Sequence, residues 1–242
     1  MNIKIQSYGE GEPLVLFHGW GFDSRVWELL TSSLITSGYQ LYLVDLPGFG
    51  KTPLSDWAYF KTQLLAKLPP RFALIGWSMG GLYATRLAIE VPLRITHLVN
   101  VASSPKFVKE ENWPGIEKDL FDKFYLNLGQ TPSQTLIEFV DLQARGENKQ
   151  TLQALISDPT SEGLKNGLDC LVQWDLRNSL NSITIPVCYL FGRLDAITPY
   201  KTKVAMEKKY PKFTYETFRK SAHMPFLSQK SDFVRLLKEF IV

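Results

Sequence analysis

The sequence predicts an α/β protein with a mostly parallel central sheet, helices on both faces, and one helical insertion. Short apolar runs rich in β-branched residues alternate with stretches of helical spacing, which indicates parallel strands joined by helices. The alternation stops over residues 106–180, where no such run occurs. The 242 residues fit one α/β unit, since such domains often run to about 250 residues.

Five buried strands are predicted, each too short for a helix and bounded by turn-forming residues. They are Leu14–Phe17, Leu41–Val44, Phe72–Ile75, His97–Val101 and Val187–Phe191. Helices are predicted over Val26–Ile35, Met79–Val91 and Thr202–Lys209. We therefore expect a core made of residues 1–105 and 181–242.

Residues 106–180 are expected to form a helical lid on this core. Apolar side chains between 116 and 128 fall on one helical face, and a second helix is predicted from Pro132 to about Ala144. A leucine stripe over 164–171 predicts a third.

Composition and charge exclude several classes of protein. The net charge of +3, from 27 basic and 24 acidic residues, is too balanced to predict a nucleic-acid partner. No apolar run approaches the roughly 18 residues of a membrane span, and the first residues lack the layout of a signal peptide. Two cysteines, Cys170 and Cys188, make no disulfide framework and fit a reduced compartment. We expect a cytoplasmic monomer that binds neither nucleic acid nor membrane.

The distribution of charge along the chain is uneven. Residues 106–180 carry 8 basic and 12 acidic side chains, a net charge of −4, whereas residues 181–242 carry 11 and 5, a net charge of +6. This uneven distribution indicates either ordinary solvated helix faces or a docking surface for an acidic partner.

Two nucleotide-binding motifs are nearly matched and both fail. The sequence Gly50-Lys51-Thr52 ends like a P-loop, but Asp45 stands where the first glycine is required. The stretch 19–24 begins like a dinucleotide fingerprint and ends on Ser24 in place of glycine. We therefore expect no nucleotide, and the chemistry argued below requires no metal or organic cofactor.

The strongest motif is Gly76-Trp77-Ser78-Met79-Gly80, which lies between a predicted strand and a predicted helix. A G-x-S-x-G sequence in this context is typical of a nucleophile elbow, a sharp turn that presents the serine at the carboxyl edge of the sheet. Flanking glycines permit such a turn because they have no side chains to clash. We interpret Ser78 as a catalytic nucleophile.

A serine nucleophile needs a base, and the base needs an orienting acid. Of the three histidines, His97 opens a strand, where a structural role is expected, and His18 precedes Ser78. Because the chain order in such enzymes is serine, acid, histidine, His223 is the predicted base. Asp195 follows the strand 187–191 and is the predicted acid. Two other aspartates, Asp169 and Asp175, lie in the helical insertion and are poorer candidates.

An oxyanion hole requires two fixed backbone N–H donors. The amide of Met79, the residue after the nucleophile, is the first candidate. The second is the amide of Trp20, which lies between two glycines after an early strand. His18 is then expected to support this loop, and Asp45 to cap a turn.

At these residues the chain resembles the α/β-hydrolase superfamily and, within it, the pimeloyl-acyl carrier protein methyl ester esterases of biotin synthesis. The resemblance covers nearly the whole chain, and its more specific parts lie around the lid. The motifs are FHGWG (17–21), VDLPGFG (44–50), GWSMGG (76–81), VASSPKF (101–107), WPGI (113–116), FVDLQ (139–143), DLR (175–177) and SAHMPF (221–226).

The resemblance implies a serine carboxylesterase that releases methanol from a pimeloyl methyl ester borne on acyl carrier protein. It places the nucleophile, acid and base on Ser78, Asp195 and His223. The substrate contacts that it implies are Trp20, Ser78, Met79, Phe139, Val140, Asp141, Leu142, Gln143 and His223. We also expect Phe121, Phe124, Tyr125 and Phe139 either to face the acyl chain or to pack the lid on the core.

One departure from the family concerns the carrier. The resemblance implies docking through basic lid residues, whereas this lid is acidic, with Gln134 and Glu138 in its second helix. Five basic residues could still cluster on it: Lys106, Lys109, Arg145, Lys149 and Lys165.

Two other readings stay open. One is another serine hydrolase of the same fold, such as a general short-chain carboxylesterase active on small esters, a carbon–carbon hydrolase or a lactonase. The other is a hydrolase-fold ligand receptor, which turnover would exclude.

Overall fold

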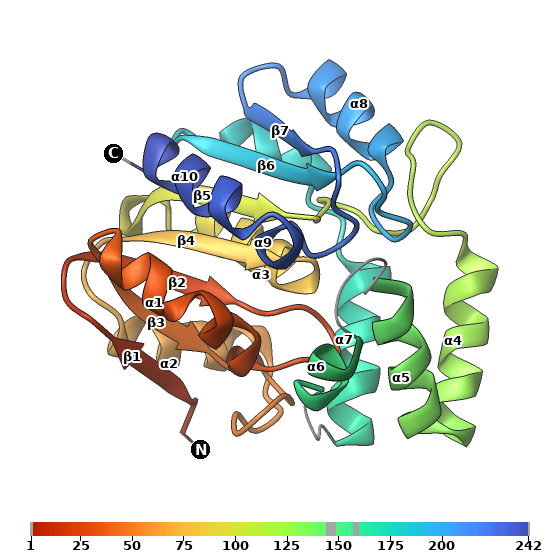
Figure 1. Cartoon of the computed structure of the whole chain (residues 1–242). Coiled ribbons are helices and arrows are strands. Elements are labelled where there is room, and N and C mark those ends of the chain that lie inside the picture. Colours follow the sequence, from red (N-terminus) through yellow and green to blue (C-terminus); the bar gives the residue numbers. More distant parts are fainter. Residues whose placement is uncertain (1, 144–148, 157–159, 242) are drawn as a thin grey trace.

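The computed structural model describes residues 2–143, 149–156 and 160–241. Its seven-stranded sheet has the order β1-β3-β2-β4-β5-β6-β7 (Figure 1). Strand β1 pairs antiparallel with β3, and the other neighbouring strands are parallel. The strands are β1 (Ile5–Tyr8), β2 (Glu12–Phe17), β3 (Tyr39–Val44), β4 (Phe72–Trp77), β5 (Ile95–Val101), β6 (Val187–Gly192) and β7 (Thr214–Phe218).

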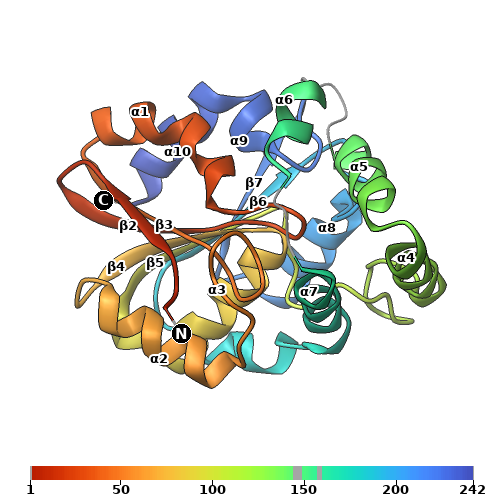
Figure 2. The same cartoon turned by 90° about the horizontal axis from the view of Figure 1, so that it is seen from below.

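Helices cover both faces of the sheet, with α2, α3 and α8 on one side and α1, α9 and α10 on the other (Figure 2). Alternate residues of each central strand enter two separate apolar clusters, so that Leu74 packs with one layer and Ile75 with the other. Burial on both faces explains why these strands read as continuous apolar runs. The core helices are α1 (Glu28–Thr36), α2 (Trp57–Lys67), α3 (Met79–Glu90), α8 (Tyr200–Lys209), α9 (Pro225–Ser228) and α10 (Lys230–Phe240).

All five predicted strands are confirmed, each extended by one or two residues, and so are the three predicted core helices. The sequence did not predict the edge strands β1 and β7. Each has a neighbour on one side only, and the sequences IQSY and TYETF mix polar and exposed residues into their pattern. An edge strand with a solvated side has no need of a continuous apolar run.

Four helices lie between β5 and β6 in the described chain, with no strand among them, as predicted. They are α4 (Lys118–Gln130), α5 (Pro132–Gln143), α6 (Lys149–Ala154) and α7 (Ser161–Gln173). Figure 1 shows them together beyond the carboxyl ends of the parallel strands. Thr160 caps the start of helix α7, because its hydroxyl accepts a hydrogen bond from Gly163 N.

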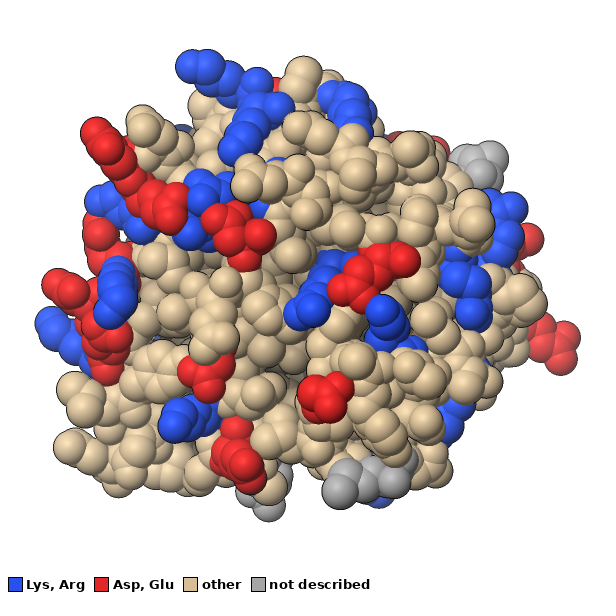
Figure 3. All heavy atoms as spheres, turned by 180° about the vertical axis from the view of Figure 1, so that it is seen from behind, with Lys and Arg blue, Asp and Glu red and all other residues tan. Residues whose placement is uncertain are grey.

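The surface carries both signs of charge. On the face opposite to that of Figure 1, basic and acidic side chains are interspersed (Figure 3). Among the described residues, no helix is both long and apolar enough to cross a membrane.

Candidate active site

Ser78 occupies the sharp turn between β4 and α3. Its φ of 55° and ψ of −118° lie outside ordinary helix and strand regions, and Ala102 is the only other described non-glycine residue with positive φ. The turn is held by its neighbours. Ser78 N donates to Val101 O at 2.9 Å, and the hydroxyl of Ser103 donates to Ser78 O at 2.8 Å. The strained backbone of the predicted elbow is therefore fixed from β5 and the loop after it.

The glycines around Ser78 provide space for close packing, and neither has a positive φ. A Cβ on Gly76 would lie 2.3 Å from Gly80 O, and one on Gly80 would lie 2.4 Å from Phe17 O. These contacts press the start of α3 against the end of β4 and against the loop after β2. Side chains at either position would push the elements apart.

Asp195 and His223 meet at the carboxyl edge of the sheet, as the sequence order predicts for an acid and a base. His223 Nδ1 lies 2.8 Å from Asp195 Oδ2, and both residues are buried. Asp195 Oδ1 accepts hydrogen bonds from the amides of Ile197 at 2.8 Å and Thr198 at 3.0 Å. The carboxylate is thus fixed on one side by backbone and presents its other oxygen to the imidazole.

The base also lies against the elbow. Trp77, the residue before Ser78, donates its Nε1–H to His223 O at 2.9 Å, and the two rings are 5.8 Å apart between centroids. His223 Nε2 is buried and has no hydrogen-bond partner among the described residues. A carboxylate on Nδ1 orients the ring so that Nε2 can accept a proton.

The two candidate oxyanion donors belong to elements in direct contact. Trp20 and Met79 are both buried, and the start of α3 abuts the loop of Trp20 through Gly80. Gly21 has a φ of 82°, a value that L-residues rarely adopt, and so lets the chain turn directly after Trp20. The Trp20 indole donates to Leu164 O in α7 at 2.9 Å, which ties this loop to the lid.

His18 and Asp45 have the supporting positions that the sequence predicts. His18 Nε2 accepts from Leu46 N at 3.0 Å, which leaves Nδ1 to donate to Gly19 O at 2.8 Å. Burial lowers the pKa of His18, so the ring is neutral and acts as a brace. The carboxylate of Asp45 accepts from the amides of Ser24 and Lys51, each at 2.9 Å.

The other predicted candidates lie in structural contacts. His97 packs its ring against Phe240, and burial lowers its pKa. Asp169 accepts a hydrogen bond from the Tyr125 hydroxyl at 2.7 Å, which joins α7 to α4. Asp175 forms ion pairs with Lys106 and Arg177.

An apolar cavity of about 130 Å³ opens at Ser78 beneath the lid. Side chains from the lid and from the loop after β6 line it, and we call it the acyl pocket. Its lining residues are Ser78, Phe107, Ile116, Leu120, Phe121, Phe124, Phe139, Leu142, Leu168, Leu171, Ala196 and Ile197. The lid therefore supplies most of the apolar walls of the pocket, and the edge of the sheet supplies the polar side chain of Ser78.

The lid stretch 139–143 is divided by the helical period of α5. Phe139 and Leu142 line the acyl pocket, and the Phe139 ring also packs edge-on against Trp20 at 5.0 Å. Val140 is buried in the apolar cluster on the α1 and α10 side. Asp141 pairs with Lys149, and Gln143 is buried, with its amide donating to Phe139 O. The structure thus brings two of these five side chains to the pocket.

Three residues that shape the site were missed by the sequence argument. Ser103 holds the elbow, and the hydroxyl of Thr198 donates to Ala102 O at 3.0 Å, which ties the Asp195 loop to the end of β5. Gly167 of α7 packs on the oxyanion elements, since a Cβ there would lie 2.6 Å from Trp20 Cδ1 and 3.0 Å from Met79 Sδ. Ser103 lies within the motif VASSPKF (101–107), but the motif does not state its role, and only tertiary contacts identify the roles of all three residues.

Known proteins match this chain over its whole length. A family model described as alpha/beta hydrolase fold matches residues 12–229, a range that contains Ser78, Asp195 and His223. A pimeloyl-[acyl-carrier protein] methyl ester esterase of Legionella pneumophila (strain Corby) is 53% identical over 242 residues, 100% of both chains. One of the same name from Aliivibrio salmonicida is 37% identical over 251 residues, 99% of this chain and 96% of its own. The structure of an esterase from Exiguobacterium antarcticum matches with a TM-score of 0.91 at 25% identity, covering 99% of this chain and 95% of that one.

Proposed function

The chain belongs to the alpha/beta hydrolase family and, within it, to the pimeloyl-[acyl-carrier protein] methyl ester esterases, and on that premise we propose its reaction. It hydrolyses pimeloyl-[acyl-carrier protein] methyl ester to pimeloyl-[acyl-carrier protein] and methanol, a step of biotin synthesis. The observation that carries the mechanism is the buried Asp195–His223 pair, whose Nε2 bonds to no described residue, beside a strained serine at an apolar pocket.

In the first half-reaction the Ser78 oxygen attacks the ester carbonyl carbon while His223 Nε2 takes the hydroxyl proton. Asp195 stabilises the imidazolium that forms and keeps its Nδ1–H directed at the carboxylate. The amides of Trp20 and Met79 donate to the oxyanion of the tetrahedral intermediate. The carbon–oxygen bond to the methoxy group then breaks, and His223 Nε2 gives its proton to the departing oxygen, so that methanol leaves.

In the second half-reaction water attacks the acyl-enzyme, and His223 serves again as base and then as acid. The water oxygen enters the new carboxylate, and Ser78 recovers its proton. The reaction consumes one water and needs no redox partner.

The acyl pocket suits a chain of methylene groups, because its lining is apolar apart from the nucleophile. Residues 106–180 act in this proposal as a lid domain over a core of residues 1–105 and 181–242. The partner is acyl carrier protein, small esters serve as surrogate substrates, and the chain acts as a monomer, which light scattering on the purified protein would check.

The direct test compares the wild-type chain with Ser78→Ala on the carrier-borne methyl ester, with methanol release as the readout. We expect turnover to fall by about 10⁴- to 10⁶-fold in a variant whose circular dichroism is unchanged. Undiminished hydrolysis by the folded variant would contradict the assignment of the nucleophile. A wild-type preference for p-nitrophenyl esters over the carrier-borne ester would instead indicate a general carboxylesterase.

A further inference from the structure

We propose that the acidic carrier protein docks on a basic groove between α8 and β7, beside the lid, rather than on the lid helices. This inference rests on the proposed function, because it assigns the surface that receives the proposed carrier. We call this surface the α8–β7 groove, and its charged or aromatic lining residues are Arg193, Tyr200, Lys203, Tyr215, Glu216 and Arg219.

The basic side chains of the lid are mostly neutralised by acidic partners within the lid itself. Of the cations between 106 and 180 that the structure describes, five form ion pairs and only Lys123 and Lys165 form none, while Arg145 lies outside the described residues. The paired ones are Lys106, Lys109, Lys118, Lys149 and Arg177. The expected cluster of lid cations therefore presents little unbalanced positive charge to a partner.

The α8–β7 groove carries unbalanced positive charge. It has a volume of about 650 Å³. Arg193 and Arg219 are exposed and form no ion pair with any described residue, and Arg193 stacks over the Tyr200 ring at 4.6 Å. Lys203 is paired with Glu207, and among the described residues Glu216 is the one acidic side chain that lines the groove. Helix α8 itself carries two further exposed cations, Lys201 and Lys208, which likewise form no ion pair in the described chain.

The groove is built on the two loops that hold the candidate acid and base. Arg193 and Arg219 are the first residues after β6 and β7, two positions before Asp195 and four before His223. Backbone bonds of 2.9 Å join these loops, from Arg193 N to Phe218 O and from Leu194 N to Ser221 O.

The same loop connects the groove with the acyl pocket. It begins at Arg193 in the groove and reaches Ala196 and Ile197, which line the pocket together with Ser78. Leu194 and Ala196 are exposed along this loop and offer an apolar edge between the two sites. A carrier held in the groove can therefore pass its acyl arm over a short apolar rim to the nucleophile.

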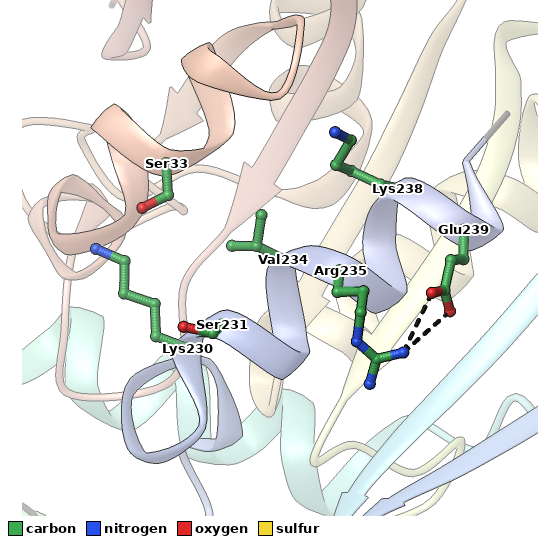
Figure 4. A pocket seen from close by; sticks show the side chains of 7 residues that line it. All are labelled: Ser33, Lys230, Ser231, Val234, Arg235, Lys238 and Glu239. Atoms are coloured by element: carbon green, nitrogen blue, oxygen red, sulfur yellow. Dashed lines mark hydrogen bonds and ion pairs between the residues drawn. The ribbon is translucent and has the colours of Figure 1, made fainter.

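A second basic hollow lies between α1 and α10 and is the main competitor (Figure 4). There Arg235 is paired with Glu239 at 3.1 Å and with Asp232, and Lys230 donates to Leu29 O at 2.6 Å. Its described lining residues come from α1 and α10, and none lies on a loop that carries Asp195 or His223. Lys230 and Lys238 form no ion pair with any described residue, so the hollow matches the groove in free charge but has no direct route to the acyl pocket.

Charge reversal at the groove tests the proposal. The double variant Lys201→Glu with Arg219→Glu changes exposed side chains outside the Asp195 loop. We expect its kcat/KM for the carrier-borne ester to fall on the order of 10- to 100-fold, mainly through KM, since opposite charge speeds encounter. Hydrolysis of p-nitrophenyl esters should stay within about twofold, because docking charges do not act on a free ester.

Two control variants carry the same change in net charge at other places. Lys123→Glu with Lys165→Glu tests the lid, and Lys230→Glu with Lys238→Glu tests the α1–α10 hollow. Neither should lower activity on the carrier-borne ester by more than about twofold. If activity on the carrier-borne ester fell in either control variant and not in the groove variant, the proposal would be overturned.

Binding separates this inference from the proposed function. In a Ser78→Ala background, the affinity for fluorescently labelled pimeloyl-[acyl-carrier protein] methyl ester can be measured by anisotropy without turnover. Weaker binding in the groove variant supports the docking site, whereas unchanged binding, or no binding by the parent, refutes it. Failure of the proposed function would show instead as wild-type hydrolysis of small esters with none of the carrier-borne ester.

Discussion

Single residues in the site are held by backbone groups from distant parts of the chain. Ser78 keeps its unusual φ and ψ because Val101 O accepts its amide and Ser103 caps its carbonyl. Asp195 is held by the amides of Ile197 and Thr198. Such fixed geometry removes the cost of reorganisation when charge develops in the transition state.

The orientation of His223 depends on one carboxylate oxygen, so Asp195→Asn should be severely impaired. The amide can keep the hydrogen bonds to the loop but presents an N–H donor to Nδ1, which favours the wrong imidazole tautomer. We expect kcat for p-nitrophenyl acetate to fall by about 10⁴-fold at neutral pH. A variant that keeps a tenth of wild-type kcat would show that Asp195 is not the orienting acid.

At the scale of elements, helix α7 connects the lid to the catalytic core. Trp20 donates to Leu164 O, Tyr125 of α4 donates to Asp169, and Gly167 packs against Trp20 and Met79. One helix thus contacts both lid helix α4 and the two proposed oxyanion donors, Trp20 and Met79.

Gly167→Ala should damage activity more than its small size suggests. Its methyl group would overlap Trp20, whose indole is anchored, so the oxyanion loop or α7 must shift. We expect destabilisation of about 1–3 kcal/mol from overpacking and at least a tenfold loss of kcat/KM. Both are measurable by thermal unfolding and ester hydrolysis.

Gly129→Ala in α4 is the matched control, because a Cβ there meets nothing within 4 Å. Alanine has the higher helix propensity, so this variant should be as stable as the wild type or more so. If the two variants had the same stability and the same kcat/KM, the packing role of Gly167 would be contradicted.

The start and end of the lid segment are tied together by an ion-pair cluster whose effect should depend on pH. The Arg177 guanidinium holds the pKa of Asp175 well below its ordinary value of 3.8, and Lys106 adds to this. Because the folded pKa is depressed, the stabilisation is present above the ordinary value and fades as the pH falls below about 4.

Asp175→Asn should therefore lower the melting temperature at pH 6 and have a shrinking effect toward pH 3. Because the side chains of this ion-pair cluster are partly exposed to solvent, the change in melting temperature should be small. Thermal unfolding of both proteins across this range provides the measurement. A difference in melting temperature that stays constant with pH would show that Asp175 acts without its charge.

At the scale of the whole molecule, the sequence predicted what depends on local pattern. The five central strands, the elbow at Ser78 and the order of Asp195 and His223 could be read because burial and turn chemistry leave local signals. The edge strands β1 and β7 could not, since their residues are partly solvated. Ion pairs such as Lys106–Asp175 join segments far apart in sequence, so the charge that remains free on the lid could not be counted from composition.

The fold shows where the net charges of residues 106–180 and 181–242 lie on the molecule. The acidic side chains of the lid pair with most of its cations, and the positive excess of the last segment includes Arg193 and Arg219, which lie on the loops that carry Asp195 and His223. A near-neutral total charge thus contains a local basic surface beside the acyl pocket.

The two roles of Trp20 have a consequence for how the lid and the site affect each other. Its side chain bonds to the lid at Leu164 O, while its backbone amide is the proposed oxyanion donor. Lid position and readiness for the reaction are then linked by a coupling free energy, which must act equally in both directions. A transition-state analogue that fills the proposed oxyanion hole would stabilise the contact between Trp20 and α7, and a mutation that loosens α7 would weaken binding of that analogue without touching it.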